Sequence, residues 1–292
     1  MSAPSPIAQS APAPAELREV HGPSALGGGP RRFFDLLWLM SATEFKRVYF
    51  GTVFGYLWSL VRPLMLFGVL LFVFTQVFKV GSSLHNYPVL LLLGIVQYTF
   101  FQEATTSAVT SVVGQEGVVR KTQFPRLVIP LATVLTAFFN FCLNLVVVFA
   151  FILAWGVEPM WTWLLFPVAV AALFVLTAAV SMILSVLFVR FRDVAIIWTV
   201  LAQVLFYATP ILYPLGLEDF LSETVENLLM LNPLAVIFEQ VRVWMLESSA
   251  PSPAEAAGGA LHLLPALAIY VGVCAFAVWI FNREAPRVAE EL

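Results

Sequence analysis

The sequence predicts an all-α integral membrane protein with six transmembrane helices. Of its 292 residues, 60% are hydrophobic and only 11% are charged, whereas about 45–50% of the residues in soluble domains are apolar. A helix that crosses a bilayer core about 30 Å thick needs about 20 apolar residues, and the chain contains six apolar stretches of this kind. We place the spans at residues 52–78, 87–112, 127–154, 163–189, 194–213 and 260–281.

The distribution of Lys and Arg predicts a multi-pass protein of the plasma (inner) membrane with both termini in the cytoplasm. Cytoplasmic segments of membrane proteins carry an excess of these residues. With the N terminus inside, only Lys79 and Arg242 lie outside, and Arg62 lies within a span. The remaining basic residues lie inside: Arg18, Arg31, Arg32, Lys46, Arg47, Arg120, Lys121, Arg126, Arg190, Arg192, Arg283 and Arg287.

The N-terminal region divides into a tail and a helix. Residues 1–30 contain six prolines and four glycines and lack the apolar core of a signal peptide, so we expect a disordered tail; residues 286–292 form a C-terminal tail. Residues 31–50 predict an amphipathic helix in the plane of the cytoplasmic membrane surface. The alternative is a soluble lead-in that continues span one. The apolar stripe comprises Phe34, Trp38, Ala42, Phe45 and Tyr49.

Residues 113–125, between spans two and three, predict a short cytoplasmic helix. Gly114 and Gly117 loosen the end of the span, Glu116 is charged, and Pro125 prevents the same helix from continuing. The alternative is an ordinary basic loop. The stretch GVVRKT resembles a phosphate loop, but Lys121 lacks the glycine that must precede it, so we expect no nucleotide binding by this chain.

Residues 216–248, between spans five and six, predict two short re-entrant helices on the outer side. Pro210 and Pro214 break the chain while it is still apolar, and the next apolar stretch is broken at Asn232-Pro233. Neither piece spans a bilayer comfortably, and irregular backbone at membrane depth must be buried in protein or line a wet cavity. The alternative is a peripheral helical hairpin outside the membrane.

Two charged residues lie near the middle of the membrane. Arg62 is ten residues above the cytoplasmic start of span one, and Glu103 is nine residues above the cytoplasmic end of span two, so both lie at a depth of roughly 14 to 15 Å. Because an isolated arginine at this depth is costly, we expect Arg62 to pair with Glu103 or to meet water, with Pro63 kinking the helix just above. The alternative is that Arg62 snorkels to the inner interface.

Aromatic residues are abundant near the predicted ends of a pore, where sugar rings can stack on them. The alternative for most of them is core packing or a belt at the membrane interface. The candidates are Tyr56, Trp58, Tyr98, Phe101, Trp198, Phe206, Tyr207 and Tyr213.

The sequence offers no catalytic or metal-binding constellation. It contains no HExxH or GxSxG motif and no carboxylate pair. His21, His85 and His262 lack the spacing of metal ligands. We therefore expect neither an enzyme nor a cofactor in this chain.

Five motifs follow one another between about residues 31 and 285. They read FKRVYFGTVFGYLWSLVRPLM, YPVLLLLGIVQYTFFQEA, VVGQEGVVRKTQFPRLVIP, FVRFRDV and FYATPILYP, the last followed by LNPLAVIFEQVR. In sequence and in order they resemble the permease subunits of ABC-2 type polysaccharide exporters, which include the O-antigen, capsule and teichoic acid transporters. In that family a neutral polar residue is expected at the position of Arg62 more often than arginine.

The resemblance implies a homodimer that works with two copies of a separate ATP-hydrolysing subunit, which holds ATP and magnesium. The cargo would be a lipid-linked glycan, and the other partner would be membrane lipid, with no nucleic acid. Residues 31–50 would be the interfacial helix, and residues 216–248 would form the outer gate together with Pro210, Tyr213, Pro214, Asn232 and Pro233. The segment that couples to the ATPase would contain Gly114, Gln115, Glu116, Gly117, Val118, Arg120 and Lys121.

Two other functions compete with glycan export. An ABC-2 exporter of small hydrophobic drugs or lipids would keep the coupling helix, but the interfacial helix and FYATPILYP favour glycan export. An intramembrane transferase that acts on lipid-linked sugars would need an acid or histidine cluster at a wet membrane face, and only Glu103 is a buried acid in the predicted spans.

Overall fold

The computed structural model describes residues 29–49, 55, 57–77, 86–115, 117, 125–213, 215, 223–246 and 252–284. Within these residues every regular element is a helix. The long elements are α1 (Pro30–Tyr49), α2 (Leu57–Phe72), α3 (Tyr87–Gly114), α5 (Val128–Ala154), α6 (Phe166–Arg190), α7 (Val194–Tyr207) and α11 (Leu264–Glu284). The shorter ones are η1 (Val73–Val77), η3 (Trp161–Leu165), α8 (Glu223–Leu229), α9 (Pro233–Met245), α10 (Pro253–Ala256) and η4 (Ala260–Leu263).

Four of the described helices are long and apolar enough to cross a membrane: Leu57–Val77, Val128–Ala154, Trp161–Arg190 and Ala260–Glu284. They correspond to the first, third, fourth and sixth predicted spans. The second predicted span is the 28-residue α3, which carries Gln97, Gln102 and Glu103 along its length. The fifth is the 14-residue α7, which at 1.5 Å per residue is about 21 Å long and shorter than the bilayer core.

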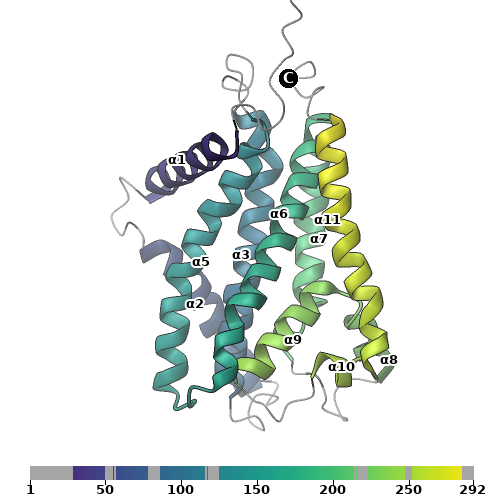
Figure 1. Ribbon diagram of the computed structural model, residues 1–292. Coiled ribbons are helices and arrows are strands. Elements are labelled where there is room, and N and C mark those ends of the chain that lie inside the picture. The colour runs from purple at the N-terminus through teal and green to yellow at the C-terminus, as the bar shows by residue number, and fades with distance from the viewer. Residues whose placement is uncertain are drawn as a thin grey trace, which may run out of the picture.

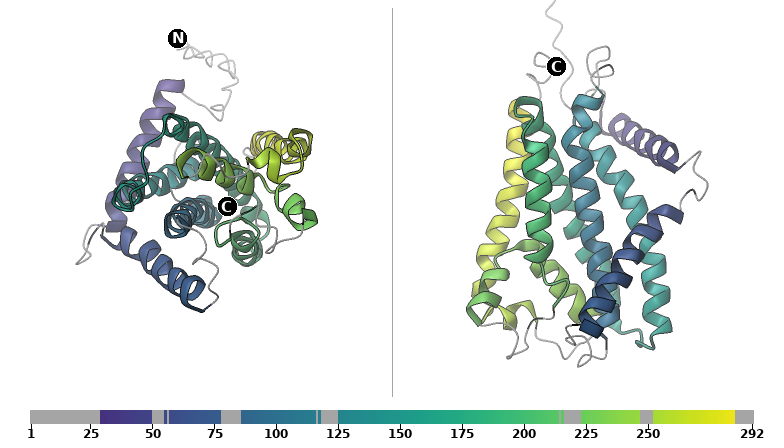
Figure 2. Two further views of the ribbon diagram at one scale, coloured as in Figure 1. Left: turned by 90° about the horizontal axis from the view of Figure 1, so that it is seen from below. Right: turned by 180° about the vertical axis from the view of Figure 1, so that it is seen from behind.

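The core of the bundle forms around α3, which packs against α2, α5, α6, α7 and α9. Buried residues occur on all sides of α3 from Tyr87 to Tyr98, as expected for a helix at the centre of a bundle. From Thr99 onward, the face that carries Gln102 and Thr106 is less buried. Aromatic rings fill the space beside it, and Phe100 stacks on Phe141 with ring centroids 5.0 Å apart. Figures 1 and 2 show the other helices arranged around α3.

α1 lies obliquely across the bundle near the end where α11 finishes (Figure 1). The Ser41 side chain is fully buried against α5, where its hydroxyl donates to the Ala132 carbonyl at 3.2 Å. Trp38 and Phe45 both contact the Phe139 ring edge-to-face. Phe34 and Trp38 are nevertheless 64% and 62% exposed.

Different helices lie at the two ends of the bundle. α1, the start of α5 and the last turn of α11 lie at one end, while α8 and α10 lie at the other (Figure 1). α2 and α11 lie on opposite sides of the bundle (Figure 2). The chain therefore has a helix lying across one end and short helices gathered at the other.

Candidate functional site

A groove of about 930 Å³ runs between α2, α3 and α7. Neutral hydroxyl and amide side chains make up much of its lining, although α2 and α7 are strongly apolar helices. Arg62 and Glu103 line it as well, together with Trp58 and Pro63. The neutral polar side chains are Ser59, Thr99, Gln102, Thr106, Ser107 and Thr199.

Arg62 and Glu103 line the same groove, but no guanidinium nitrogen of Arg62 lies within 4.0 Å of a Glu103 carboxylate oxygen. The Glu103 carboxylate accepts a hydrogen bond of 2.7 Å from the Asn140 amide on α5. The sequence predicted that Arg62 pairs with Glu103 or meets water; the described conformation has no direct pair and places both side chains on the groove.

Asn140 and Asn144 are groove-supporting residues that the sequence analysis missed. The Asn144 amide donates to the carbonyls of Asn140, at 2.9 Å, and Ser59, at 3.3 Å. The chain of bonds therefore links α5 to α2 and to the acid of α3. The signal in the sequence was two asparagines four residues apart in an otherwise apolar span, since this spacing places both on one helix face.

Four of the aromatic residues predicted to line the pathway lie instead in the contact between α3 and α7. Tyr98, Phe101, Trp198 and Phe206 are each at most 8% exposed, and the Tyr98 hydroxyl donates to the Ala202 carbonyl. The Trp198 indole donates to the Thr105 hydroxyl at 3.1 Å. Because these side chains pack against one another and not on the groove, we correct their location to the core.

The remaining pathway aromatics have different environments. Trp58 lines the groove and is 51% exposed. Tyr207 is 58% exposed, at the end of α7. Tyr56 lies outside the described residues.

The predicted coupling segment is described only at its start. α3 ends at Gly114, and the Gln115 backbone N–H closes the helix on the carbonyls of Val112 and Val113. Gly117 is exposed. The other coupling residues, Glu116, Val118, Arg120 and Lys121, lie outside the described residues.

Asn232 joins the predicted outer-gate helix α9 to the end of α7. Its side-chain oxygen caps α9 by accepting from the Leu234 backbone N–H at 3.0 Å, and Pro233 occupies the first turn. Its amide donates to the Ala208 carbonyl at 3.3 Å and to the Thr209 hydroxyl at 3.1 Å. One asparagine thus starts α9 and fixes it to the chain that follows α7.

The turn after α7 packs tightly on α3. Pro210 is buried, and the Tyr213 hydroxyl donates to the Tyr207 carbonyl at 2.9 Å. A Cβ atom on Gly94 would lie 3.1 Å from Ile211 Cγ2. Pro214, the other predicted breaker, lies outside the described residues.

α9 is also held at its far end and carries a buried ion pair. The Thr162 hydroxyl and the Trp163 indole of η3 donate to the carbonyls of Trp244 and Met245, at 2.5 and 3.0 Å. Arg242, which the charge distribution assigned to the outer side, forms an ion pair of 2.9 Å with Glu239, and the exposed fractions of the two side chains are 8% and 1%. Burial of both partners indicates that α9 packs into the bundle and does not lie on its surface.

Apolar spans around a polar groove define an integral membrane protein of the transport class. The chain belongs to the family described as ABC-2 type transporter, whose family model matches residues 35–246. It is 32% identical over 203 residues to the O-antigen export system permease protein RfbA of Klebsiella pneumoniae, covering 69% of this chain and 76% of that protein. It is 28% identical over 263 residues to the protein of the same name from Myxococcus xanthus, covering 89% of this chain and 96% of that protein.

Proposed function

We propose that this chain is the transmembrane permease subunit of an ATP-driven exporter that moves a lipid-linked polysaccharide or teichoic-acid-like glycan across the plasma membrane. The groove between α2, α3 and α7 carries the proposal. Its hydroxyl and amide groups can exchange hydrogen bonds with the hydroxyl groups of sugars, whereas a hydrophobic drug would leave them unpaired at a cost. The relatives named as O-antigen export permeases support the same cargo class.

The transporter we propose contains two copies of this chain and two copies of a separate ATPase subunit that holds ATP and magnesium. Of the four candidate spans, Leu57–Val77 is the least buried: only 6% of the residues in its apolar stretch are buried by the rest of the chain. A second copy that covers α2 would close the open side of the groove. The coupling segment, residues 113–125, would dock into the ATPase, because it follows α3 at the end of the bundle where α1 also lies.

Six spans complete the topology that we propose: the four apolar helices, α3, and α7 with the turn that follows it. The termini and α1 then lie on the cytoplasmic side. α8 and α9 form the outer gate with the turn at Pro210 and Tyr213. Support comes from the gathering of α8 and α10 at the end opposite the last turn of α11 (Figure 1).

The test is whether the groove is wet and whether its obstruction stops export. In a chain whose two natural cysteines are replaced by serine, Thr106→Cys should react with a water-soluble maleimide, because Thr106 lines the groove and is exposed. The bulky adduct should then abolish the appearance of glycan at the surface of cells that also produce the ATPase. The measurements are the labelled fraction and surface glycan detected by antibody.

Two matched positions control for access and for damage. Val175→Cys on α6 is 47% exposed but lies outside the groove, so the lipid that surrounds it should prevent labelling. Trp161→Cys is 90% exposed at the start of η3, so it should label without loss of export. Full export from fully labelled Thr106→Cys protein would refute the groove as the path.

A further inference from the structure

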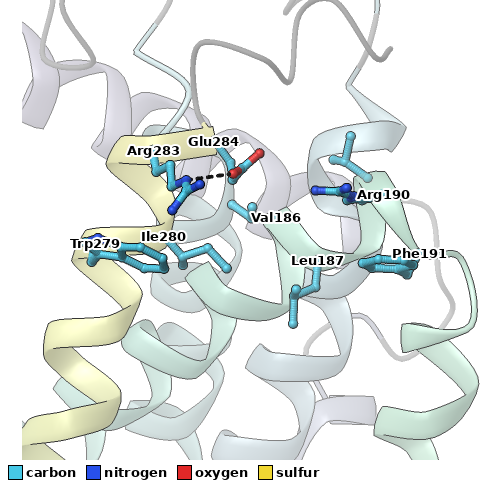
Figure 3. Close-up of a pocket in the computed structure, with 9 residues that line it drawn as sticks. Val186, Leu187, Arg190, Phe191, Trp279, Ile280, Arg283 and Glu284 are labelled. Carbon is cyan, nitrogen blue, oxygen red and sulfur yellow. Dashed lines mark ion pairs between the residues drawn. The ribbon is translucent and has the colours of Figure 1, made fainter.

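A second, smaller pocket lies between the C-terminal ends of α6 and α11, with a volume of about 250 Å³ (Figure 3). Arg190 on α6 and Arg283 on α11 contribute its positive charges, and Glu284 contributes one negative charge. The lining therefore has a net charge of +1. Val186, Leu187 and Ile280 form its apolar part, which continues into the contact between the two helices.

Both arginines stack on aromatic rings. The Arg283 guanidinium carbon lies 5.2 Å from the centroid of Trp279, and that of Arg190 lies 5.6 Å from the centroid of Phe191. A guanidinium that stacks by its face keeps its in-plane N–H groups clear of the ring, and this geometry suits a phosphate. The Arg283 Nε also forms an ion pair of 3.7 Å with the Glu284 carboxylate (Figure 3), which leaves the terminal N–H groups of Arg283 for the phosphate. The two rings are 53% and 55% exposed, as is usual for aromatic residues at a membrane interface.

We propose that this pocket binds an anionic phospholipid of the cytoplasmic leaflet, with its phosphate between Arg190 and Arg283 and an acyl chain along Leu187 and Ile280. The assignment of the pocket to the cytoplasmic leaflet rests on the proposed function, which places the C-terminal ends of α6 and α11 at the cytoplasmic face. Basic pockets between membrane helices on this side commonly bind the headgroups of anionic lipids. The combination of two guanidinium groups in the lining and an apolar floor favours a lipid over a soluble anion.

The ligand is a resident lipid and not the cargo, because the pocket lies away from the groove. α11 and α2 are on opposite sides of the bundle (Figure 2), and the two pockets share no lining residue. Its volume is also below the roughly 300–1,000 Å³ usual for small-molecule sites. A headgroup fits such a pocket, but a sugar polymer does not.

The experiment counts lipids bound to the complete transporter by native mass spectrometry as phosphatidylglycerol is added in detergent. The unmodified chain should retain one tightly bound phosphatidylglycerol per copy and no phosphatidylcholine in its place. Arg190→Gln with Arg283→Gln should weaken this binding roughly thirtyfold, because each basic group at an anionic lipid surface strengthens binding about fivefold. Arg192→Gln is the matched control, since Arg192 is a neighbouring exposed arginine that stacks on Phe188 outside the pocket.

A gain of binding provides a second readout that misfolding cannot imitate. Glu284→Gln removes the negative charge from the lining, so it should tighten phosphatidylglycerol binding severalfold. Four results would overturn the proposal: equal loss in Arg192→Gln, equal binding of phosphatidylcholine, displacement of the lipid by inorganic phosphate at the same concentration, or preference for a polyprenyl phosphate. Absence of the lipid from the complete transporter, when the chain purified without the ATPase retains it, would assign the arginines to that partner instead.

This readout is lipid binding and not export, so it can fail while the groove experiment succeeds. The reverse outcome is equally distinguishable, since a bound lipid does not depend on a working glycan path. If the double arginine variant loses thermal stability to the same extent with and without phosphatidylglycerol, the arginines serve the negative ends of the α6 and α11 dipoles, and the lipid site is wrong.

Discussion

Replacement of Asn232 by alanine should release α9 from the end of α7. The substitution removes the oxygen that caps α9 at the Leu234 N–H and the amide that donates to Ala208 and Thr209. The two functions of this side chain can be separated. Asn232→Asp keeps an oxygen for the cap but loses the donor, so it should detach α9 from α7 without fraying the first turn.

The structure sets the size of the expected effect. Loss of an N-cap asparagine costs about 1 kcal/mol. Each amide hydrogen bond contributes about 0.5–1.5 kcal/mol, and the bond to Ala208 is long at 3.3 Å, which places it at the lower end. Asn232→Ala should therefore destabilise the attachment of α9 by about 2–3 kcal/mol, and Asn232→Asp by about 1–2 kcal/mol.

Hydrogen–deuterium exchange of the complex measures both effects. Loss of the cap alone costs about 1 kcal/mol, and 1.4 kcal/mol corresponds to a factor of ten. In Asn232→Ala, the Leu234 amide should therefore exchange at least about fivefold faster. In Asn232→Asp, the Leu234 amide should stay protected while the later amides of α9 exchange faster. Asn282→Ala on the exposed face of α11 is the control and should leave α9 unchanged.

One pattern of exchange would refute this reasoning. If α9 keeps its protection in both Asn232 variants, its position does not depend on the side chain that bridges it to α7. The contacts of Thr162 and Trp163 at the other end of α9 would then be sufficient on their own.

Two further predictions concern packing and protonation. Gly94→Ala should destabilise the chain by about 1–3 kcal/mol, because its Cβ would lie 3.1 Å from Ile211; Gly272→Ala on α11, with open space around it, should be neutral or stabilising, and equal melting temperatures for the two variants would contradict the close packing. The capping box at α10, in which the Ser252 N–H donates to the Glu255 carboxylate at 2.6 Å, holds the pKa of Glu255 below its ordinary value. The stability from this cap is therefore present above the ordinary glutamate pKa of about 4.3 and is lost as the pH falls through the folded value. An NMR titration should show the pKa of Glu255 rise only part of the way toward the ordinary value in Ser252→Ala, because the variant loses the Ser252 hydroxyl but keeps the backbone N–H that donates to the carboxylate. An unchanged pKa would exclude the Ser252 hydroxyl as a cause of the lowered value.

The sequence predicted where helices begin and end better than it predicted which faces meet. Proline lacks a backbone N–H, so the break after α7 at Pro210 and the start of α9 at Pro233 could be predicted from single residues. The length of α7 could not be predicted, because the apolar chain continues past Tyr207 into the turn that packs on Gly94. Apolar composition alone does not distinguish a helix from the buried turn that follows it.

The candidate site was predicted in part, for a related reason. A charged residue is easily identified within an apolar span, so Arg62 and Glu103 could be predicted as site residues from the sequence. Both line the groove. The aromatic residues of α3 could not be placed in the same way, because the half of α3 that ends at Tyr98 is buried on all sides and its sequence does not show that Tyr98 faces α7. The partner of Glu103 could not be predicted either, since the bond to Asn140 joins residues 37 positions apart.

The attachments of α9 use main-chain acceptors at both ends. Asn232 donates to the carbonyl of Ala208, and Thr162 and Trp163 donate to the carbonyls of Trp244 and Met245. A carbonyl is present whatever side chain its residue carries, so these three acceptor positions can change in evolution without loss of the attachment. The donors have no such freedom, and selection to keep α9 in place therefore acts on Asn232, Thr162 and Trp163 more strongly than on Ala208, Trp244 and Met245.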